Sequence, residues 1–273
     1  MPPIALTIAG SDPSGGAGIQ ADLKTFHQFG VYGEAVLTLL TVQNTQRVSR
    51  VDVLSPDLVK EQLEAVLNDI PPNAAKTGAL GSVEVVETIS ELAAAFTFPL
   101  VVDPVMISKH GAPLLSRDAE HAIRHKLIPH AELVTPNIPE AAVLAGMPVA
   151  TEEDVREAAI RIRALGAKAV LIKGGHRAGE PVDVLLDEGG VLSFPAERIN
   201  TRHTHGTGCT YAAAITACLA LGHPLREAIR ISRAYVQHAI QTAPELGSGN
   251  GPVNHFAGVD LLIPSAARST GRW

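Results

Sequence analysis

Cysteine is scarce in this sequence, which has only Cys209 and Cys218 among its 273 residues. Both fall in one predicted helix and lie too far apart along it to form a disulfide with each other. A secreted scaffold stapled by disulfides is therefore excluded, and we expect a reduced, cytoplasmic protein.

Aromatic residues and an excess of positive charge are also lacking. Phe, Trp and Tyr make up 4% of the chain, and 22 Lys and Arg are outnumbered by 28 Asp and Glu, for a formal net charge of −6. No basic stripe or groove studded with aromatics is visible, as a nucleic-acid-binding protein would need. We therefore expect a small molecule as the partner and no nucleic acid.

Long hydrophobic runs are absent as well. The apolar run Ile4–Ala9 has no basic segment before it, and no stretch is long enough to span a bilayer. We expect neither secretion nor a membrane partner. With 46% hydrophobic residues, the chain can nevertheless bury a substantial core. We predict one domain over residues 1–265 and a disordered polar tail over residues 266–273.

Short apolar runs rich in β-branched residues alternate along the chain with amphipathic helical patterns. This alternation is typical of an α/β protein whose parallel sheet is covered by helices on both faces. The predicted strands are Ile4–Ala9, Ala35–Thr41, Ala74–Lys76, Leu100–Val102, Leu133–Thr135 and Ala169–Ile172, with an edge hairpin over Val182–Leu186 and Gly190–Ala196. The predicted helices are Ile19–Phe29, Pro56–Leu67, Val83–Ala94, Arg117–Leu127, Pro139–Leu144, Glu152–Leu165, Gly208–Ala220 and Leu225–Gln241.

The segment His203–Thr210 is a glycine-containing loop that opens into a helix of small residues. The start of such a helix presents unpaired N–H groups at the positive end of its dipole, where an anion binds well. Gly206 and Gly208 leave room for close approach, and Cys209 adds a polarised thiol, so the segment suggests phosphoryl transfer. The alternative is an ordinary helix start, with Thr207 as the cap and Cys209 as a small buried side chain.

Motifs that follow neighbouring parallel strands are expected to converge at the carboxyl edge of the sheet. The first, Gly10–Asp22, is rich in glycine but lacks the Lys-Ser or Lys-Thr of a P-loop and the glycine spacing of a dinucleotide site. Because it also contains Asp12 and Asp22, we favour a floor or lid for the substrate over a simple structural turn.

Three further motifs place charged or amide groups directly after buried strands. Asp103 follows one strand, and Asn137 and Glu140 follow the next, spaced by about one helical turn, so that they could share a hydrated Mg²⁺. The alternative for Asn137 and Glu140 is a helix cap with an acidic residue in the first turn. Lys173 ends a third strand and is either a solvated lysine or a contact for phosphate.

Taken together, the ordered motifs resemble the hydroxymethylpyrimidine/phosphomethylpyrimidine kinases of thiamine biosynthesis, which belong to the ribokinase-like superfamily. The resemblance extends from about Ile4 to Phe256. The segments that carry it are Gly10–Phe26, Val42–Thr45, Ala75–Gly78, Asp103–Met106, Thr135–Glu140, Ile172–His176, His203–Thr210 and Gly247–Phe256.

The resemblance implies a three-layer α/β/α fold with a mostly parallel sheet, a homodimer, and two successive phosphorylations by ATP with Mg²⁺. The first acts on the hydroxymethyl group of an aminopyrimidine and the second on the resulting monophosphate. It implies that Lys173 and Asn137 bind ATP, and that Asn137, Glu140 and, more weakly, Asp103 serve the metal. It also assigns the anion hole and proton transfer to Gly206, Thr207, Gly208 and Cys209, and the pyrimidine pocket to Gly10, Ala17, Asp22, Gln43 and Val105.

One residue departs from the family pattern. Ala79 stands where relatives often carry a bulky methionine against the ring, so a pyridoxal kinase activity on the same scaffold is the nearest alternative. A non-catalytic pyrimidine sensor is a second alternative, although the residues for metal and anion binding are present. A zinc site built from His203, His205 and Cys209 is a third, for which no fourth ligand is evident.

Overall fold

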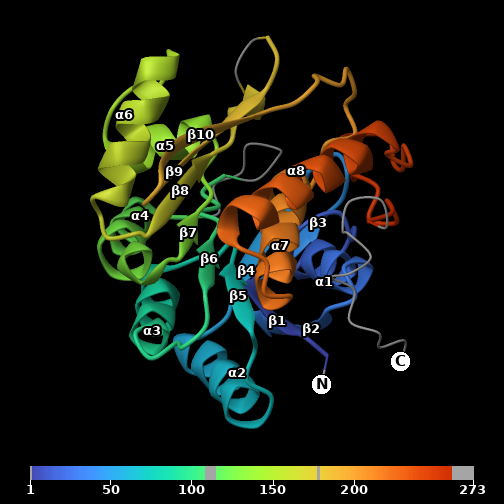
Figure 1. The fold of residues 1–273 in the computed structure, drawn as a ribbon. Coiled ribbons are helices and arrows are strands. Elements are labelled where there is room, and N and C mark those ends of the chain that lie inside the picture. Colours follow the sequence, from blue (N-terminus) through green and yellow to red (C-terminus); the bar gives the residue numbers. More distant parts are fainter. Residues whose placement is uncertain (1, 108–114, 177–178, 260–273) are drawn as a thin grey trace.

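Three layers make up the molecule, a central sheet with helices packed on both of its faces (Figure 1). The structure is a computed structural model that describes residues 2–107, 115–176 and 179–259. The sheet has eight strands in the order β10-β9-β8-β7-β6-β5-β1-β2, parallel from β2 to β8, with β9 and β10 antiparallel at one edge. This arrangement confirms the predicted three-layer α/β/α, ribokinase-like fold class.

The elements have the following bounds. The strands are β1 Ile4–Ala9, β2 Tyr32–Leu37, β3 Leu39–Gln43, β4 Val48–Val53, β5 Ala74–Thr77, β6 Leu100–Val102, β7 Leu133–Val134, β8 Ala169–Ile172, β9 Val182–Asp187 and β10 Gly190–Pro195. The helices are α1 Gly18–Gln28, α2 Pro56–Asp69, α3 Val83–Ala93, α4 Arg117–Ala122, α5 Ile138–Ala145, α6 Glu152–Arg163, α7 Thr207–Ala220 and α8 Leu225–Gln241.

Alternate residues of each central strand supply two separate cores. In β6, Leu100 and Val102 pack against the layer that contains α2 to α6, whereas Val101 packs against α1, α7 and α8. Because both faces are covered, these strands consist mostly of apolar residues, which is why their positions could be predicted from the sequence. The small residues of α7, such as Ala213 and Ala217, are fully buried and let this helix lie close to the sheet.

Two parts of the chain differ from the prediction. The strand expected over Ala35–Thr41 is divided at Thr38, where the chain leaves the main sheet and forms the separate β3–β4 hairpin. The partner strand β4 was missed because most of its side chains are exposed and show no apolar alternation. The helix expected over Arg117–Leu127 ends as α4 at Ala122 and continues as a π-helical turn.

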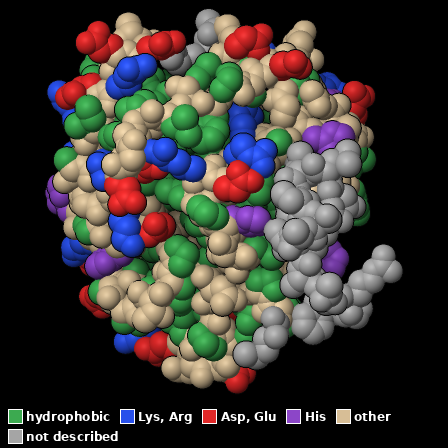
Figure 2. Space-filling view, in the orientation of Figure 1, with side chains coloured by type: hydrophobic (Ala, Val, Ile, Leu, Met, Phe, Trp, Pro, Cys, Tyr) green, Lys and Arg blue, Asp and Glu red, His purple; other side chains and the backbone are tan. Residues whose placement is uncertain are grey.

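The surface carries charges of both signs. On the face seen in Figure 2, acidic and basic side chains are interspersed and form no extended patch of one sign. Within the described ranges, no helix has the length and apolar character needed to cross a membrane. The tail predicted over residues 266–273 lies outside the described residues.

Glu34, on the edge strand β2, gives a prediction about stability. It is buried, its Oε2 has no hydrogen-bond partner within the described part of the chain, and burial together with Asp69 raises its pKa to about 7. A raised carboxyl pKa means that ionisation destabilises the folded state, so stability falls as pH rises from about 4.5 through about 7. We expect Glu34→Gln to raise the free energy of unfolding at pH 8 by about 1–2 kcal/mol, with solvent screening limiting the gain.

Urea unfolding at several pH values tests this prediction. The gain should disappear as the pH approaches 4.5, the ordinary pKa of the group. Glu61→Gln, on the exposed face of α2, is the matched control and should change little. A Glu34→Gln gain that is independent of pH would contradict the proposed cause.

Candidate functional site

A pocket of about 650 Å³ opens at the carboxyl edge of the sheet. The segments that follow β1, β5, β6, β7 and β8 line it, together with the start of α7 and the β3–β4 hairpin. This is the edge at which parallel α/β sheets bind their ligands. All the predicted site residues line this pocket except Asp22.

The start of α7 forms one wall of the pocket. The cap residue is Gly206, with φ of 78°, and not Thr207, whose hydroxyl instead donates to the Thr204 carbonyl oxygen over 2.7 Å. A Cβ on Gly206 would lie 1.7 Å from the carbonyl oxygen of Gly16, so this contact requires glycine. No side-chain cap occupies the first turn of α7. The Thr207 N–H donates to the Thr204 carbonyl oxygen over 3.3 Å, whereas the N–H groups of Gly208 and Cys209, which line the pocket, are left for a ligand.

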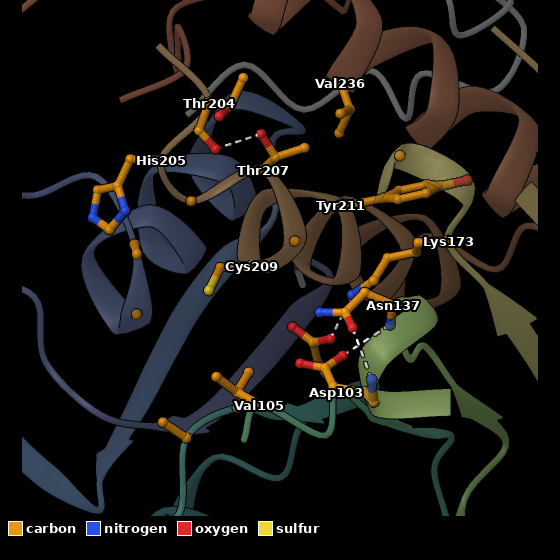
Figure 3. A pocket seen from close by; sticks show the side chains of 18 of the residues that line it. Asp103, Val105, Asn137, Lys173, Thr204, His205, Thr207, Cys209, Tyr211 and Val236 are labelled. Atoms are coloured by element: carbon orange, nitrogen blue, oxygen red, sulfur yellow. Dashed lines mark hydrogen bonds and ion pairs between the residues drawn. The ribbon is translucent and has the colours of Figure 1, made fainter. Parts of the chain in front are cut away.

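Lys173 and Asp103 form an ion pair beside the first turn of α7, with Nζ and Oδ1 2.8 Å apart. A Cβ on Gly208 would lie 3.4 Å from that Nζ, so the cation and the helix start face the same point. Burial alone lowers the pKa of Lys173, but Asp103 and Glu140 raise it by more, and the lysine stays protonated. Figure 3 shows Asp103, Asn137 and Lys173 gathered on one side of the pocket, with Cys209 between them and His205. The arrangement can hold an anionic group against a cation and a helix N-terminus.

Asn137 and Glu140 form a capping box at the start of α5. The Asn137 side chain accepts from the Glu140 N–H over 2.9 Å, and the Glu140 carboxylate accepts from the Asn137 N–H over 2.8 Å. The alternative of a helix cap is therefore confirmed, although both residues also line the pocket. Burial raises the pKa of Glu140 to about 7, with Lys173 opposing and Asp103 adding to the rise. A cation bound here would relieve this cost.

Cys209 faces the pocket, but its thiol differs from the expected thiolate. Burial raises its pKa to about 12, and Asp22 and Asp103 add to the rise, while Lys76 and the backbone N–H of Gly18 oppose it. Burial, together with these acidic neighbours, therefore opposes the thiolate expected at the helix N-terminus.

Asp22 requires a second correction. It was expected to line the pyrimidine pocket, but it is fully buried on α1, with its Oδ2 2.7 Å from Lys76 Nζ and 2.6 Å from the Thr7 hydroxyl. Lys76, on β5, lines the pocket in its place. Sequence reasoning missed Lys76 as a site residue, although a lysine within an apolar strand before Thr77 and Gly78 was a usable signal.

The other end of the pocket flanks Lys173, on the side away from His205 (Figure 3). Apolar residues line it, among them Pro181, Ile199, Val236 and Ile240, together with polar residues of the same segments, Glu197, Arg198 and Gln237. The buried carboxylate of Asp183 accepts from the Gly174 N–H over 2.8 Å and pairs with Arg233, whose Nε lies 3.0 Å from Oδ2. These contacts fix the turn after Lys173. The sequence contained no recognisable motif for this end.

The glycine-rich loop is built around the carboxylate of Asp12. Its oxygens accept from the N–H groups of Ser14, Gly16 and Ala17 and from the ring of His205. The loop is thus both a structural turn and, through Gly10 and Ala17, a floor of the pocket. His203 bonds to Arg202 instead of joining His205 and Cys209, and within the described residues no group of three or more His, Cys, Asp or Glu could hold a metal ion.

Comparison with known proteins gives a consistent picture. A sequence model described as phosphomethylpyrimidine kinase matches residues 12–254. A hydroxymethylpyrimidine/phosphomethylpyrimidine kinase from Staphylococcus aureus is 46% identical over 260 residues, which cover 94% of each chain. A thiamine biosynthesis bifunctional protein from Geobacter sulfurreducens is 52% identical over 256 residues, 92% of this chain and 52% of the longer relative.

Solved structures point to two related activities. A pyridoxal kinase from Bacillus subtilis in complex with ADP superposes with a TM-score of 0.87 at 39% identity, covering 94% of this chain and 98% of the other. A phosphomethylpyrimidine kinase from Clostridium difficile superposes with a TM-score of 0.78 at 44% identity, covering 87% and 99%. The same scaffold therefore carries kinases for a pyrimidine and for a pyridine.

Proposed function

The chain belongs to the phosphomethylpyrimidine kinase family, and from this membership and the geometry of the pocket we propose that it is a bifunctional vitamin-precursor kinase. It transfers the γ-phosphoryl group of ATP first to 4-amino-5-hydroxymethyl-2-methylpyrimidine and then to the monophosphate formed, in thiamine biosynthesis. The observation that carries this proposal is the meeting of Lys173 and the uncapped start of α7 at one point of the pocket. Phosphoryl transfer depends mainly on such positioned positive groups.

Each end of the pocket has a role in the proposal. The end of the pocket that flanks Lys173 takes the adenine, and Lys173 binds the phosphates of ATP. The anion hole of Gly206, Thr207, Gly208 and Cys209 holds the phosphoryl group in transfer. Gln43, Gly10, Ala17 and Val105, which also line the pocket, surround the pyrimidine in this proposal.

Magnesium is the proposed cofactor besides ATP. Asp103, Asn137 and Glu140 would hold it, and the raised pKa of the buried Glu140 carboxyl fits a site that is completed by a cation. The remaining ligands would be water and phosphate oxygens, which Mg²⁺ usually retains. When bound, the ion would neutralise charge on the phosphates. A single domain over residues 1–265, a homodimer and a cytoplasmic location are also proposed, on the basis of the family resemblance.

Product analysis tests the proposed function. The protein is incubated with ATP and Mg²⁺ and, in parallel, with hydroxymethylpyrimidine, its monophosphate and pyridoxal. Diphosphate formed from the first two substrates is the expected result, and omitting Mg²⁺ should abolish it. Pyridoxal phosphate as the only product would favour the second candidate, pyridoxal kinase, which the small Ala79 at the pocket and the pyridoxal kinase neighbours support. No turnover of any substrate would contradict both kinase assignments.

Cys209→Ala is expected to slow the first transfer more than the second. The alcohol must lose a proton as it attacks, whereas the second nucleophile is a phosphate oxygen that is already largely ionised near neutral pH. We expect about a 10²-fold loss of kcat for the alcohol, the lower end for a general base, because the pKa of this thiol is about 12. Cys218→Ala, in the core of the same helix, is the control. Equal losses in the two steps would contradict a base role.

A further inference from the structure

Three segments of the pocket meet at the imidazole of His205. Its Nε2 lies 2.8 Å from Oδ2 of Asp12 in the glycine-rich loop and 3.2 Å from the amide nitrogen of Gln43 at the end of β3. The ring and the Asp12 side chain are almost completely buried. The His205 backbone is also held, because its N–H donates to the Gly251 carbonyl oxygen and its own carbonyl oxygen accepts from the Val253 N–H.

The surroundings of the ring are too tight for rearrangement. A Cβ on Gly16 would lie 2.6 Å from Cδ2 of the His205 ring, so the glycine-rich loop packs directly against the imidazole. The ring therefore cannot move away from Asp12 or from Gln43 without displacing the loop. The hydrogen bonds at Nε2 must be consistent with one another in this single arrangement.

The ionisation state of Asp12 determines whether Nε2 of His205 donates or accepts in the hydrogen bond between them. Three backbone N–H groups and the Ser14 hydroxyl donate to its carboxylate. Burial alone raises the pKa of Asp12, but the bonds from His205 and Ser14 lower it by more, so the group is ionised. An ionised carboxylate only accepts hydrogen bonds. The Nε2 atom of His205 must therefore carry a hydrogen and donate it to Asp12.

This assignment limits how Gln43 can face the ring. A protonated Nε2 has no lone pair, so it cannot accept a hydrogen bond from the NH₂ group of Gln43. The amide can turn by 180° with almost no change of shape, which places its carbonyl oxygen beside the Nε2 hydrogen, so that Asp12 and Gln43 share this one hydrogen as acceptors. Its NH₂ group then faces away from His205.

We propose, building on the proposed function, that Asp12 and His205 are positioning residues that fix the Gln43 amide with its NH₂ group directed into the pocket. A pocket that presents donors selects a ring edge with an acceptor, and a ring nitrogen of the aminopyrimidine is such an acceptor. A carbonyl oxygen presented at the same place would select the exocyclic amino group instead. The Asp12–His205 pair thus determines which edge of the pyrimidine Gln43 recognises.

The test is a double-mutant cycle read by calorimetric binding of hydroxymethylpyrimidine without ATP. In Asp12→Asn the amide at position 12 can donate a hydrogen bond to Nε2 of His205 as well as accept one from it. The amide of Gln43 is then no longer held in one orientation. We expect the dissociation constant to rise about tenfold, the equivalent of one hydrogen bond, with ADP binding unchanged. In the Gln43→Ala background, Asp12→Asn should then cause no further loss. Asp52→Asn, which breaks an exposed ion pair on the same hairpin, is the matched control and should bind like the wild type.

A conservative variant adds a second readout. In His205→Gln the side-chain NH₂ group has two hydrogens, one for Asp12 and one for the Gln43 carbonyl oxygen, so most of the affinity should be kept. Losses that add in the cycle, or an Asp12→Asn variant that binds like the wild type, would overturn the positioning role. A wild-type protein that binds no hydroxymethylpyrimidine would instead refute the proposed function, and the two failures are therefore distinguishable.

Discussion

Replacing Lys76 with methionine is expected to lower the free energy of unfolding by about 3–5 kcal/mol. Lys76 and Asp22 are both fully buried, and their ion pair of 2.7 Å links the central strand β5 to α1. Burial alone lowers the pKa of Lys76, but Asp22 and Asp103 raise it by more, so the lysine is protonated. Without the lysine, the Asp22 carboxylate would be buried with only the Thr7 hydroxyl as a partner.

Urea unfolding of two further variants separates the pair from its surroundings. Asp22→Asn combined with Lys76→Met removes both charges and should recover most of the lost stability, because no unpaired charge remains. Lys126→Met breaks an exposed ion pair with Glu87 and should cost less than about 1 kcal/mol. If the single Lys76 variant is as stable as the double variant, the buried pair does not have the assigned role.

Gly206→Ala is expected to lower kcat by about 10²–10³-fold for both phosphorylations. The added Cβ would lie 1.7 Å from the Gly16 carbonyl oxygen, and the backbone φ of 78° is unfavourable for alanine. The start of α7 must then move, and the N–H groups that would stabilise the phosphoryl group move with it. Because the same anion hole serves both transfers, both should lose similar amounts, unlike in Cys209→Ala.

Gly222→Ala is the matched control for the strain alone. Its φ is 84°, but nothing lies within 4 Å of the added Cβ, and it stands just beyond the other end of α7. We expect it to lose about 1 kcal/mol of stability and to keep its activity. Steady-state kinetics on both substrates makes the comparison. Comparable kcat values for the two alanine variants would show that the contact with Gly16 does not hold the anion hole in place.

The central strands and the long helices could be predicted from the sequence. β1, β6 and β8 begin and end where the apolar runs do, because strands covered on both faces are mostly apolar. The amphipathic period of α8 likewise gave both of its ends. The division of the predicted strand at Thr38 left no local signal. There the chain bonds to the distant Ala9 and Ala79 carbonyl oxygens, which only the assembled sheet brings near.

The chemical types at the site were also readable in the sequence, but their pairings were not. Gly206, Lys173 and Asp103 were identified from their places after strands or before a helix, and Gln43 from the family resemblance. All four line the pocket. The order of the strands in the sheet determines which charged side chains form ion pairs. Asp22 pairs with a lysine 54 positions away, on the β5 strand that lies next to β1.

Some properties of the site therefore follow from the local sequence, and others arise only from the tertiary structure. The sequence by itself determined the layers, the edge of the sheet that binds ligands and the residue types there, because periodicity and strand-end position are local properties of a chain. Only the tertiary structure decided that Asp22 lies behind the pocket, that burial raises the pKa of the Cys209 thiol and that Asp12 holds His205. These outcomes depend on burial and on charges brought together from distant segments, and both exist only once the layers have packed.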